Sequence, residues 1–290
     1  MKIARFWTKA SHPVRLPRGR GFEIVCWGWS DADIQEARLK AQERARRAAT
    51  HLEEQGGGRL DRYGYGEQPL REEILREIKD ESGQMAAAIT RNSYGCLVLN
   101  TAQAMFVDID LPELERGDGI GGFLKRLFGK PSKPGPEEIV ESALTKVEEW
   151  TRTRPGWGWR AYRTRAGLRL LATHALFDPA DALVQQAFSE LDADPLYQRL
   201  CKNQRSFRAR LTPKPWRCGL GAPPVRWPWA DERAEKRFKS WESEYLKKSG
   251  QFAACQWLRD IGAAEVAPAL ASIVELHDRA TRASSGLPLA

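Results

Sequence analysis

The stretch of sequence that decides the fold reads Met105, Phe106, Val107, Asp108, Ile109, Asp110 and Leu111. Side chains two residues apart share one face of a β-strand, so a strand here would place Asp108 and Asp110 on one face and Val107 and Ile109 in a core. Aspartate is disfavoured in strands, and like charges on one face repel each other. The pattern predicts a buried strand whose carboxylates need a positive partner, either Mg²⁺ or Mn²⁺ or paired arginines.

The composition is that of a globular protein. The 290 residues are 42% hydrophobic, which suffices for one large domain or two closely packed ones. No apolar run is long enough to cross a bilayer, and the N-terminus lacks the apolar segment of a signal peptide, so no membrane partner is expected. The five cysteines are scattered and lack a Cys-x-x-Cys pair, which favours reduced thiols in a cytoplasmic protein over disulfides or zinc.

The net charge of +8 is concentrated in two stretches without any acidic residue, at 150–177 and 195–230. Arginine dominates both, and its planar guanidinium suits bidentate recognition of phosphate. Their candidate contacts to phosphate or nucleic acid are Arg163, Arg165, Arg169, Arg208, Arg210, Lys214 and Arg217. The alternative to a phosphate-binding face is a pair of solvated basic surfaces.

Hydrophobic periodicity predicts an α+β fold with a mostly antiparallel sheet flanked by helices. Strands are expected at 2–8, 22–29, 85–89, 95–99, 104–111, 159–164, 168–173, 206–211 and 252–258. Helices are expected at 30–51, 70–79, 136–151, 179–191, 195–202, 231–248 and 265–283. A tight turn at Asn100 and Thr101 should join the strands at 95–99 and 104–111.

One α+β domain is expected over residues 1–290. Within it we expect an N-terminal subdomain at 1–82, a catalytic-like core at 83–262, a flexible Gly- and Pro-rich insertion at 116–136 and a C-terminal helix at 265–283.

Three motifs follow one another along the chain. An apolar strand ends in Asp108-x-Asp110, a helix follows, and a hairpin then ends in Ala172, Thr173 and His174. This order resembles the archaeo-eukaryotic primase (primase-polymerase) superfamily. The resemblance covers about residues 85 to 260. It implies an RRM-like catalytic sheet, in which Asp108 and Asp110 hold metal ions and His174 contacts the triphosphate of a nucleotide.

The resemblance further implies a nucleotidyltransferase that uses Mg²⁺ or Mn²⁺ to join a nucleoside triphosphate to a single-stranded or primed nucleic acid. Helicase or repair partners would act as separate chains. Two metals clamp the attacking and leaving oxygens in such a reaction, and basic side chains neutralise the developing charge. The family has a third acid on a later strand, for which Asp178 and Asp260 are the candidates. Without a third acid, the alternative is a non-catalytic module that binds single-stranded nucleic acid.

The segment 213–229 contains five prolines and three tryptophans and is expected to form an extended, pinned arm. Pro213 and Pro215 fix the backbone, which would present Lys214 and Arg217 to a ligand at a low entropy cost. Tryptophans among arginines also suit stacking on unpaired bases. The alternative is a structural arm that packs against the edge of the sheet.

Overall fold

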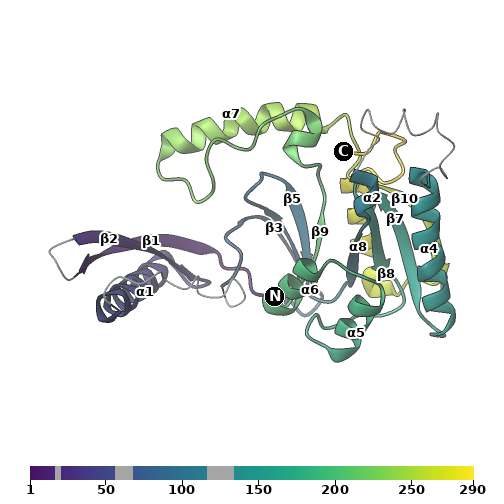
Figure 1. Ribbon diagram of the computed structural model, residues 1–290, viewed down its shortest axis with the longest axis horizontal. Helices are drawn as coiled ribbons and strands as arrows, with labels where there is room; N and C mark the ends of the chain where they lie inside the picture. The colour runs from purple at the N-terminus through teal and green to yellow at the C-terminus, as the bar shows by residue number, and fades with distance from the viewer. Residues whose placement is uncertain (17–20, 56–67, 116–133) are drawn as a thin grey trace, which may run out of the picture.

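The computed structural model describes residues 1–16, 21–55, 68–115 and 134–290. They form helices and three antiparallel sheets, which confirms the predicted α+β class. Figure 1 shows the sheets side by side along the long axis, with α7 (Glu232–Ser249) crossing above the central one. Nearly all of the insertion expected at 116–136 lies outside the described residues. In the described ranges, no helix is long and apolar enough to cross a membrane.

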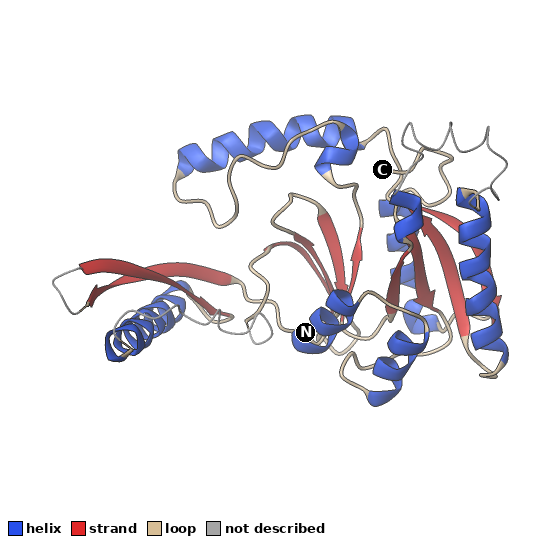
Figure 2. Cartoon of the chain, in the orientation of Figure 1, coloured by secondary structure: helices blue, strands red, loops and turns tan. Residues whose placement is uncertain are grey.

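The first sheet is a hairpin covered by a helix, and it projects from one end of the molecule (Figure 2). Its elements are β1 (Phe6–Arg15), β2 (Gly21–Ser30) and α1 (Ile34–Glu54). The carboxylate of Asp33 accepts the backbone N–H of Glu36 and so caps the start of α1. Alanines at four-residue spacing let α1 lie close to β2, where a Cβ on Gly28 would be 2.2 Å from the carbonyl oxygen of Ala37. This unit has its own small core of Val14, Ile24, Ala49 and Leu52.

The central sheet has the strand order β3-β4-β5-β9. Its strands are β3 (Glu73–Lys79), β4 (Met85–Arg91), β5 (Leu97–Thr101) and β9 (Phe207–Arg210). The helix expected at 70–79 is wrong, because this segment pairs with β4. Its Leu, Glu, Arg and Lys residues favour a helix locally, but strand pairing and the packing of Ile78 against the main core override that preference. The segment 73–79, which lies within the N-terminal subdomain expected at 1–82, forms the edge strand of this sheet.

The second four-stranded sheet has the order β10-β7-β8-β6 and carries the Asp-x-Asp stretch on its edge strand. Its strands are β6 (Phe106–Asp110), β7 (Gly158–Thr164), β8 (Gly167–Ala172) and β10 (Cys255–Gly262). The turn expected at Asn100 and Thr101 is wrong, because both residues belong to β5, and β5 and β6 lie in different sheets. Instead, the Thr101 hydroxyl donates to the carbonyl oxygen of Ala104 at 2.7 Å and stabilises the link between the sheets.

Helices cover both faces of this second sheet (Figure 1). The helices around it are α2 (Pro112–Glu115), α4 (Pro136–Arg152), α5 (Ala182–Glu190), α6 (Pro195–Gln204) and α8 (Pro268–Thr281). The ring of Trp150 in α4 lies 5.8 Å from that of Trp159, which places α4 on the Trp159 face of β7. The ring of His277 in α8 lies 4.7 Å from that of Tyr162, which places α8 on the opposite face.

The proline-rich arm at 213–229 is held by α7. The arm begins near η1 (Pro215–Cys218), a short 3-10 helix that the sequence did not predict. The Tyr245 hydroxyl donates to the carbonyl oxygen of Pro213 at 2.6 Å, and the Trp241 ring stacks on Tyr245. The same Trp241 ring fills the space beside Gly95, in the turn between β4 and β5. Helix α7 therefore fixes the start of the arm against that turn.

Candidate functional site

Asp108 forms an ion pair with an arginine across the sheet. Its partner in the β6–β8 register is Arg169, which donates from Nε and Nη2 to the two carboxylate oxygens at 2.7 and 3.1 Å. The Arg169 side chain is 2% exposed and that of Asp108 31%, so the guanidinium lies buried beneath its counter-ion. Burial alone would lower the pKa of Arg169, but the charge and hydrogen bonds of Asp108 raise it. The bidentate bridge ties β6 to β8.

Arg169 also joins the two four-stranded sheets. Its Nη1 donates to the carbonyl oxygen of Arg210 in β9 at 2.9 Å. On the edge of β6, the backbone N–H of Asp194 donates to the carbonyl oxygen of Asp108 at 3.1 Å, and the Tyr197 hydroxyl donates to that of Phe106 at 2.8 Å. The junction between β6 and β9 is therefore built from hydrogen bonds that hold Asp108 and Arg169 in place.

Asp108 and Asp110, to which the primase resemblance assigns the metal ions, differ in their surroundings. Both oxygens of Asp108 already accept hydrogen bonds from Arg169. Asp110 lies exposed at the end of β6, opposite Gly167. Among the residues that the structure describes, no group of three or more His, Cys, Asp or Glu side chains could hold a metal ion. In two-metal sites a carboxylate is shared between two cations, whereas here the carboxylate of Asp108 binds the guanidinium of Arg169.

The two candidates for a third acid pair with arginines elsewhere. Asp178 lies 3.9 Å from Arg205, and Asp260 lies 3.2 Å from Arg160. Asp260 is on β10, three strands away from β6, which corresponds to roughly 14 Å across the sheet. Neither acid therefore joins Asp108.

His174 follows β8 at the end opposite the two aspartates. Asp108 faces Arg169, five residues before His174, which is roughly 16 Å along an extended strand. The His174 ring lies 4.7 Å from that of Trp157 and 5.3 Å from that of Phe177. Burial lowers the pKa of His174, so the imidazole is neutral at neutral pH. Its contacts are those of a packing residue, and the structure does not bring it to the aspartates.

Helix α8 covers the face of the sheet that carries Asp108. His277 is fully buried between Phe106 and Tyr162, at ring-centroid distances of 5.1 and 4.7 Å. The Tyr162 hydroxyl donates to Asp278 at 2.5 Å, and Nδ1 of His277 lies 3.3 Å from the same carboxylate. Nε2 of His277 has no hydrogen-bond partner in the described part of the chain. The Phe106 end of this face is therefore closed to a large ligand.

Acid is expected to destabilise the protein through His277. Burial lowers the pKa of His277 to about 4, whereas an unperturbed histidine titrates near 6.5. Between these values the unfolded chain binds more protons than the folded one, so the stability present above pH 6.5 is lost as the pH falls towards 4. The expected loss is about 3 kcal/mol.

Urea denaturation across this pH window measures that loss. The variant His277→Phe keeps an aromatic ring between Phe106 and Tyr162 but cannot titrate, so its stability should vary less with pH. An equally steep pH dependence in the variant would show that another group is responsible.

The other residues predicted to contact phosphate lie in different parts of the structure. Nη2 of Arg208 donates to Glu72 at 2.7 Å, so this arginine holds the central sheet together. Arg163 shares the α4 face of β7 with Trp159, where burial lowers its pKa. Arg165 lies in the turn between β7 and β8. Arg163 therefore lies on the opposite face of the sheet from Arg169, and Arg208 lies in the other four-stranded sheet.

Arg210, Lys214 and Arg217 gather around the buried thiol of Cys96. Arg210 is opposite Val98, two residues after Cys96, in the β5–β9 register, and the Cys96 thiol lies 3.4 Å from the carbonyl oxygen of Pro213, which precedes Lys214. Burial raises the pKa of that thiol, and the charges of Arg210, Lys214 and Arg217 act to lower it. Arg210 is half-buried, and its pKa is lowered by burial and by the charge of Arg169. No salt bridge or hydrogen bond joins its guanidinium to another described residue. Positive charge therefore accumulates next to the Asp108–Arg169 pair.

Two exposed rings lie beside these cations. Tyr94, in the turn between β4 and β5, meets Trp216 of η1 edge to face, with ring centroids 5.3 Å apart. The two residues are 45% and 49% exposed, and Nζ of Lys214 lies 5.5 Å from the centroid of Trp216. We call Tyr94, Lys214 and Trp216 the platform. Exposed rings next to cations can stack on unpaired bases while the cations neutralise phosphates.

Sequence reasoning missed Tyr94, because nothing local connects it to an arm more than a hundred residues later in the chain. The available signal was an aromatic residue between Asn92 and Gly95, which are typical turn residues. Comparison with protein-family models, curated proteins and solved structures finds no match to this chain.

Proposed function

We propose that this chain binds single-stranded nucleic acid at the junction of its two four-stranded sheets and does not itself transfer nucleotides. The observation that carries this proposal is the platform, where two exposed rings and a lysine stand beside Arg210 and Arg217. Every base has an aromatic face, so stacking on such rings tolerates any sequence. The ligand is single-stranded because a duplex hides its base faces between neighbouring pairs.

The platform is preorganised, which lowers the entropy cost of binding. The thiol of Cys96 lies 3.4 Å from the carbonyl oxygen of Pro213, and the Tyr245 hydroxyl donates to the same oxygen. These contacts fix the backbone immediately before Lys214 and Trp216. In this proposal the arm takes both of the roles that the sequence offered as alternatives, because the contacts that pin it also orient Lys214 and Trp216 for a ligand.

In this proposal Asp108 is the counter-ion of Arg169. The ion pair neutralises a guanidinium that has almost no access to water. Arg169 in turn holds the backbone of Arg210, which anchors β9 beside β6. The acid thus contributes to the site by supporting the strand from which Arg210 projects.

Binding to single-stranded DNA or RNA should weaken steeply as salt is added. If Arg210, Lys214 and Arg217 each neutralise one phosphate, the slope of log K against log salt concentration should be about −2. Fluorescence anisotropy of a labelled oligonucleotide between about 50 and 200 mM salt measures this slope. A duplex of the same length serves as the control and should bind more weakly. A flat salt response would remove nucleic acid as the ligand.

A metal-dependent nucleotidyltransferase of the primase-polymerase type is the second candidate. It is favoured by Asp110, which is exposed and shares the Asp108 face of β6. In that case Arg169 would have to release Asp108. The two candidates differ in the incorporation of a labelled nucleotide on a primed template with Mn²⁺ present. A nucleotidyltransferase incorporates the labelled nucleotide and loses this activity when Asp108 or Asp110 is replaced. The binding module incorporates no nucleotide.

A further inference from the structure

A second group of cations lies where the N-terminal unit meets the central sheet. The guanidinium carbon of Arg71 lies 4.1 Å from the centroid of the Trp27 ring in β2. Lys9 is directly opposite Trp27 in the β1–β2 register and is exposed. Arg226, in the proline-rich arm, directly precedes Trp227, which lines a pocket with Glu73 and Ile74 at the start of β3, and its charge acts on Arg71. Two positive charges, those of Arg71 and Lys9, thus lie beside one aromatic ring, and a third, that of Arg226, acts on Arg71.

The acidic residues nearest to Arg71 in the sequence form hydrogen bonds or ion pairs with other residues. Glu72 accepts hydrogen bonds from Arg208 and from the Thr90 hydroxyl. Glu73 forms its ion pair with Arg91. Within the described ranges, neither Arg71 nor Arg226 forms an ion pair with any carboxylate. The protein therefore leaves this positive charge for an external anion.

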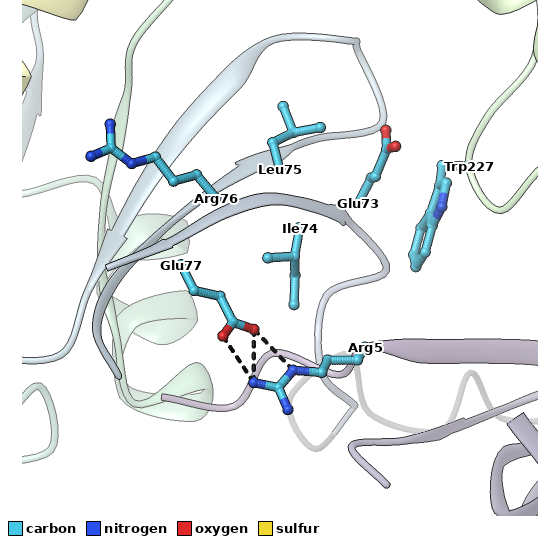
Figure 3. A pocket seen from close by; sticks show the side chains of 7 residues that line it. All are labelled: Arg5, Glu73, Ile74, Leu75, Arg76, Glu77 and Trp227. Carbon is cyan, nitrogen blue, oxygen red and sulfur yellow. Dashed lines mark hydrogen bonds and ion pairs between the residues drawn. The ribbon is translucent and has the colours of Figure 1, made fainter. Parts of the chain in front are cut away.

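This second group lies at the same end of the central sheet as the platform. Glu73, near Arg71, pairs with Arg91 in the β3–β4 register, and Arg91 directly precedes the turn that carries Tyr94. The proline-rich arm at 213–229 contains both Trp216 and Arg226, so it links the two groups along the chain. Figure 3 shows Trp227, the next residue, facing the start of β3 across a pocket of about 420 Å³.

We propose that Lys9, Trp27, Arg71 and Arg226 form a second polyanion site, which contacts phosphates of the same strand that stacks on the platform. The nature of the ligand rests on the proposed function, whereas the anion site rests on its own cations. A strand long enough to reach both sites should bind more tightly than a short one. Its affinity should also depend more steeply on salt, because more counterions are released.

The test compares the double variant Arg71→Ala, Arg226→Ala with a matched control. The control, Arg46→Ala, Arg47→Ala, removes the same charge from the exposed surface of α1, where Glu43 pairs with both arginines. The probes are labelled oligonucleotides of about 6 and about 20 nucleotides, together with inorganic polyphosphate. Fluorescence anisotropy measures the affinity for the oligonucleotides and its salt dependence. The affinity for polyphosphate is measured by calorimetry or by its displacement of a bound labelled oligonucleotide.

For the longer oligonucleotide, we expect the Arg71, Arg226 variant to bind about 10-fold more weakly at low salt and to lose about 1.4 from its salt slope. The control variant should match the wild type on both oligonucleotides, and all three proteins should bind the short one alike. Equal behaviour of the two double variants on every probe would overturn the second site. Loss of polyphosphate binding in the Arg71, Arg226 variant, with no oligonucleotide binding by the wild type, would support the anion site and overturn the proposed function.

Discussion

Replacing Asp108 with alanine is expected to lower the free energy of unfolding by about 3 kcal/mol. The substitution leaves Arg169, which is 2% exposed, as a buried charge without its bidentate partner. Its hydrogen bond to the carbonyl oxygen of Arg210 remains, but a carbonyl does not neutralise a full charge. Urea denaturation of the wild type and the variant, without added metal, measures the difference.

Two further variants make this result specific. The double variant Asp108→Ala, Arg169→Leu should be more stable than Asp108→Ala alone, because no charge stays buried. Glu141→Ala breaks an exposed ion pair with Arg259 and should have little effect. Unchanged stability of Asp108→Ala, with Mn²⁺ raising the thermal midpoint of the wild type, would contradict the counter-ion role and favour the nucleotidyltransferase.

The double variant Tyr94→Ala, Trp216→Ala is expected to weaken the binding of single-stranded nucleic acid by about 100-fold. Each exposed ring offers one stacking surface, and alanine removes it while the positive charges beside it remain. The salt slope should therefore stay near its wild-type value, whereas Lys214→Ala should reduce it by about 0.7. Anisotropy titrations with one labelled oligonucleotide at several salt concentrations separate the two effects.

Trp257→Ala is the matched control for this experiment. Trp257 is also an exposed tryptophan with an arginine over its ring, since the guanidinium carbon of Arg160 lies 4.9 Å from the ring centroid. It belongs to β10, at the far edge of the second sheet. Its replacement should leave affinity unchanged. If Trp257→Ala weakens binding as much as the platform variant does, general loss of aromatic surface explains the result and the platform has no special role.

Local patterns predicted elements well where one face of an element is buried. The alternation around Asp108 predicted β6, and the strands expected at 159–164 and 168–173 correspond to the antiparallel pair β7 and β8. At 73–79 the local pattern misled, because Leu, Glu and Arg support a helix in isolation, whereas pairing with β4 selects a strand. At Asn100 and Thr101 a turn was expected, yet both lie within β5, because the chain leaves the central sheet only after Thr101.

By itself the sequence determined that β6 is a strand with Asp108 and Asp110 on one face, and that this face needs positive charge. Only the tertiary structure decided which positive group meets Asp108. Strand register places Arg169 opposite it, from 61 residues further along the chain, and places His174 beyond reach. The same holds for the platform, whose two rings come from separate segments that α7 holds together. Periodicity acts over a few residues, whereas partners are chosen by the pairing of distant strands.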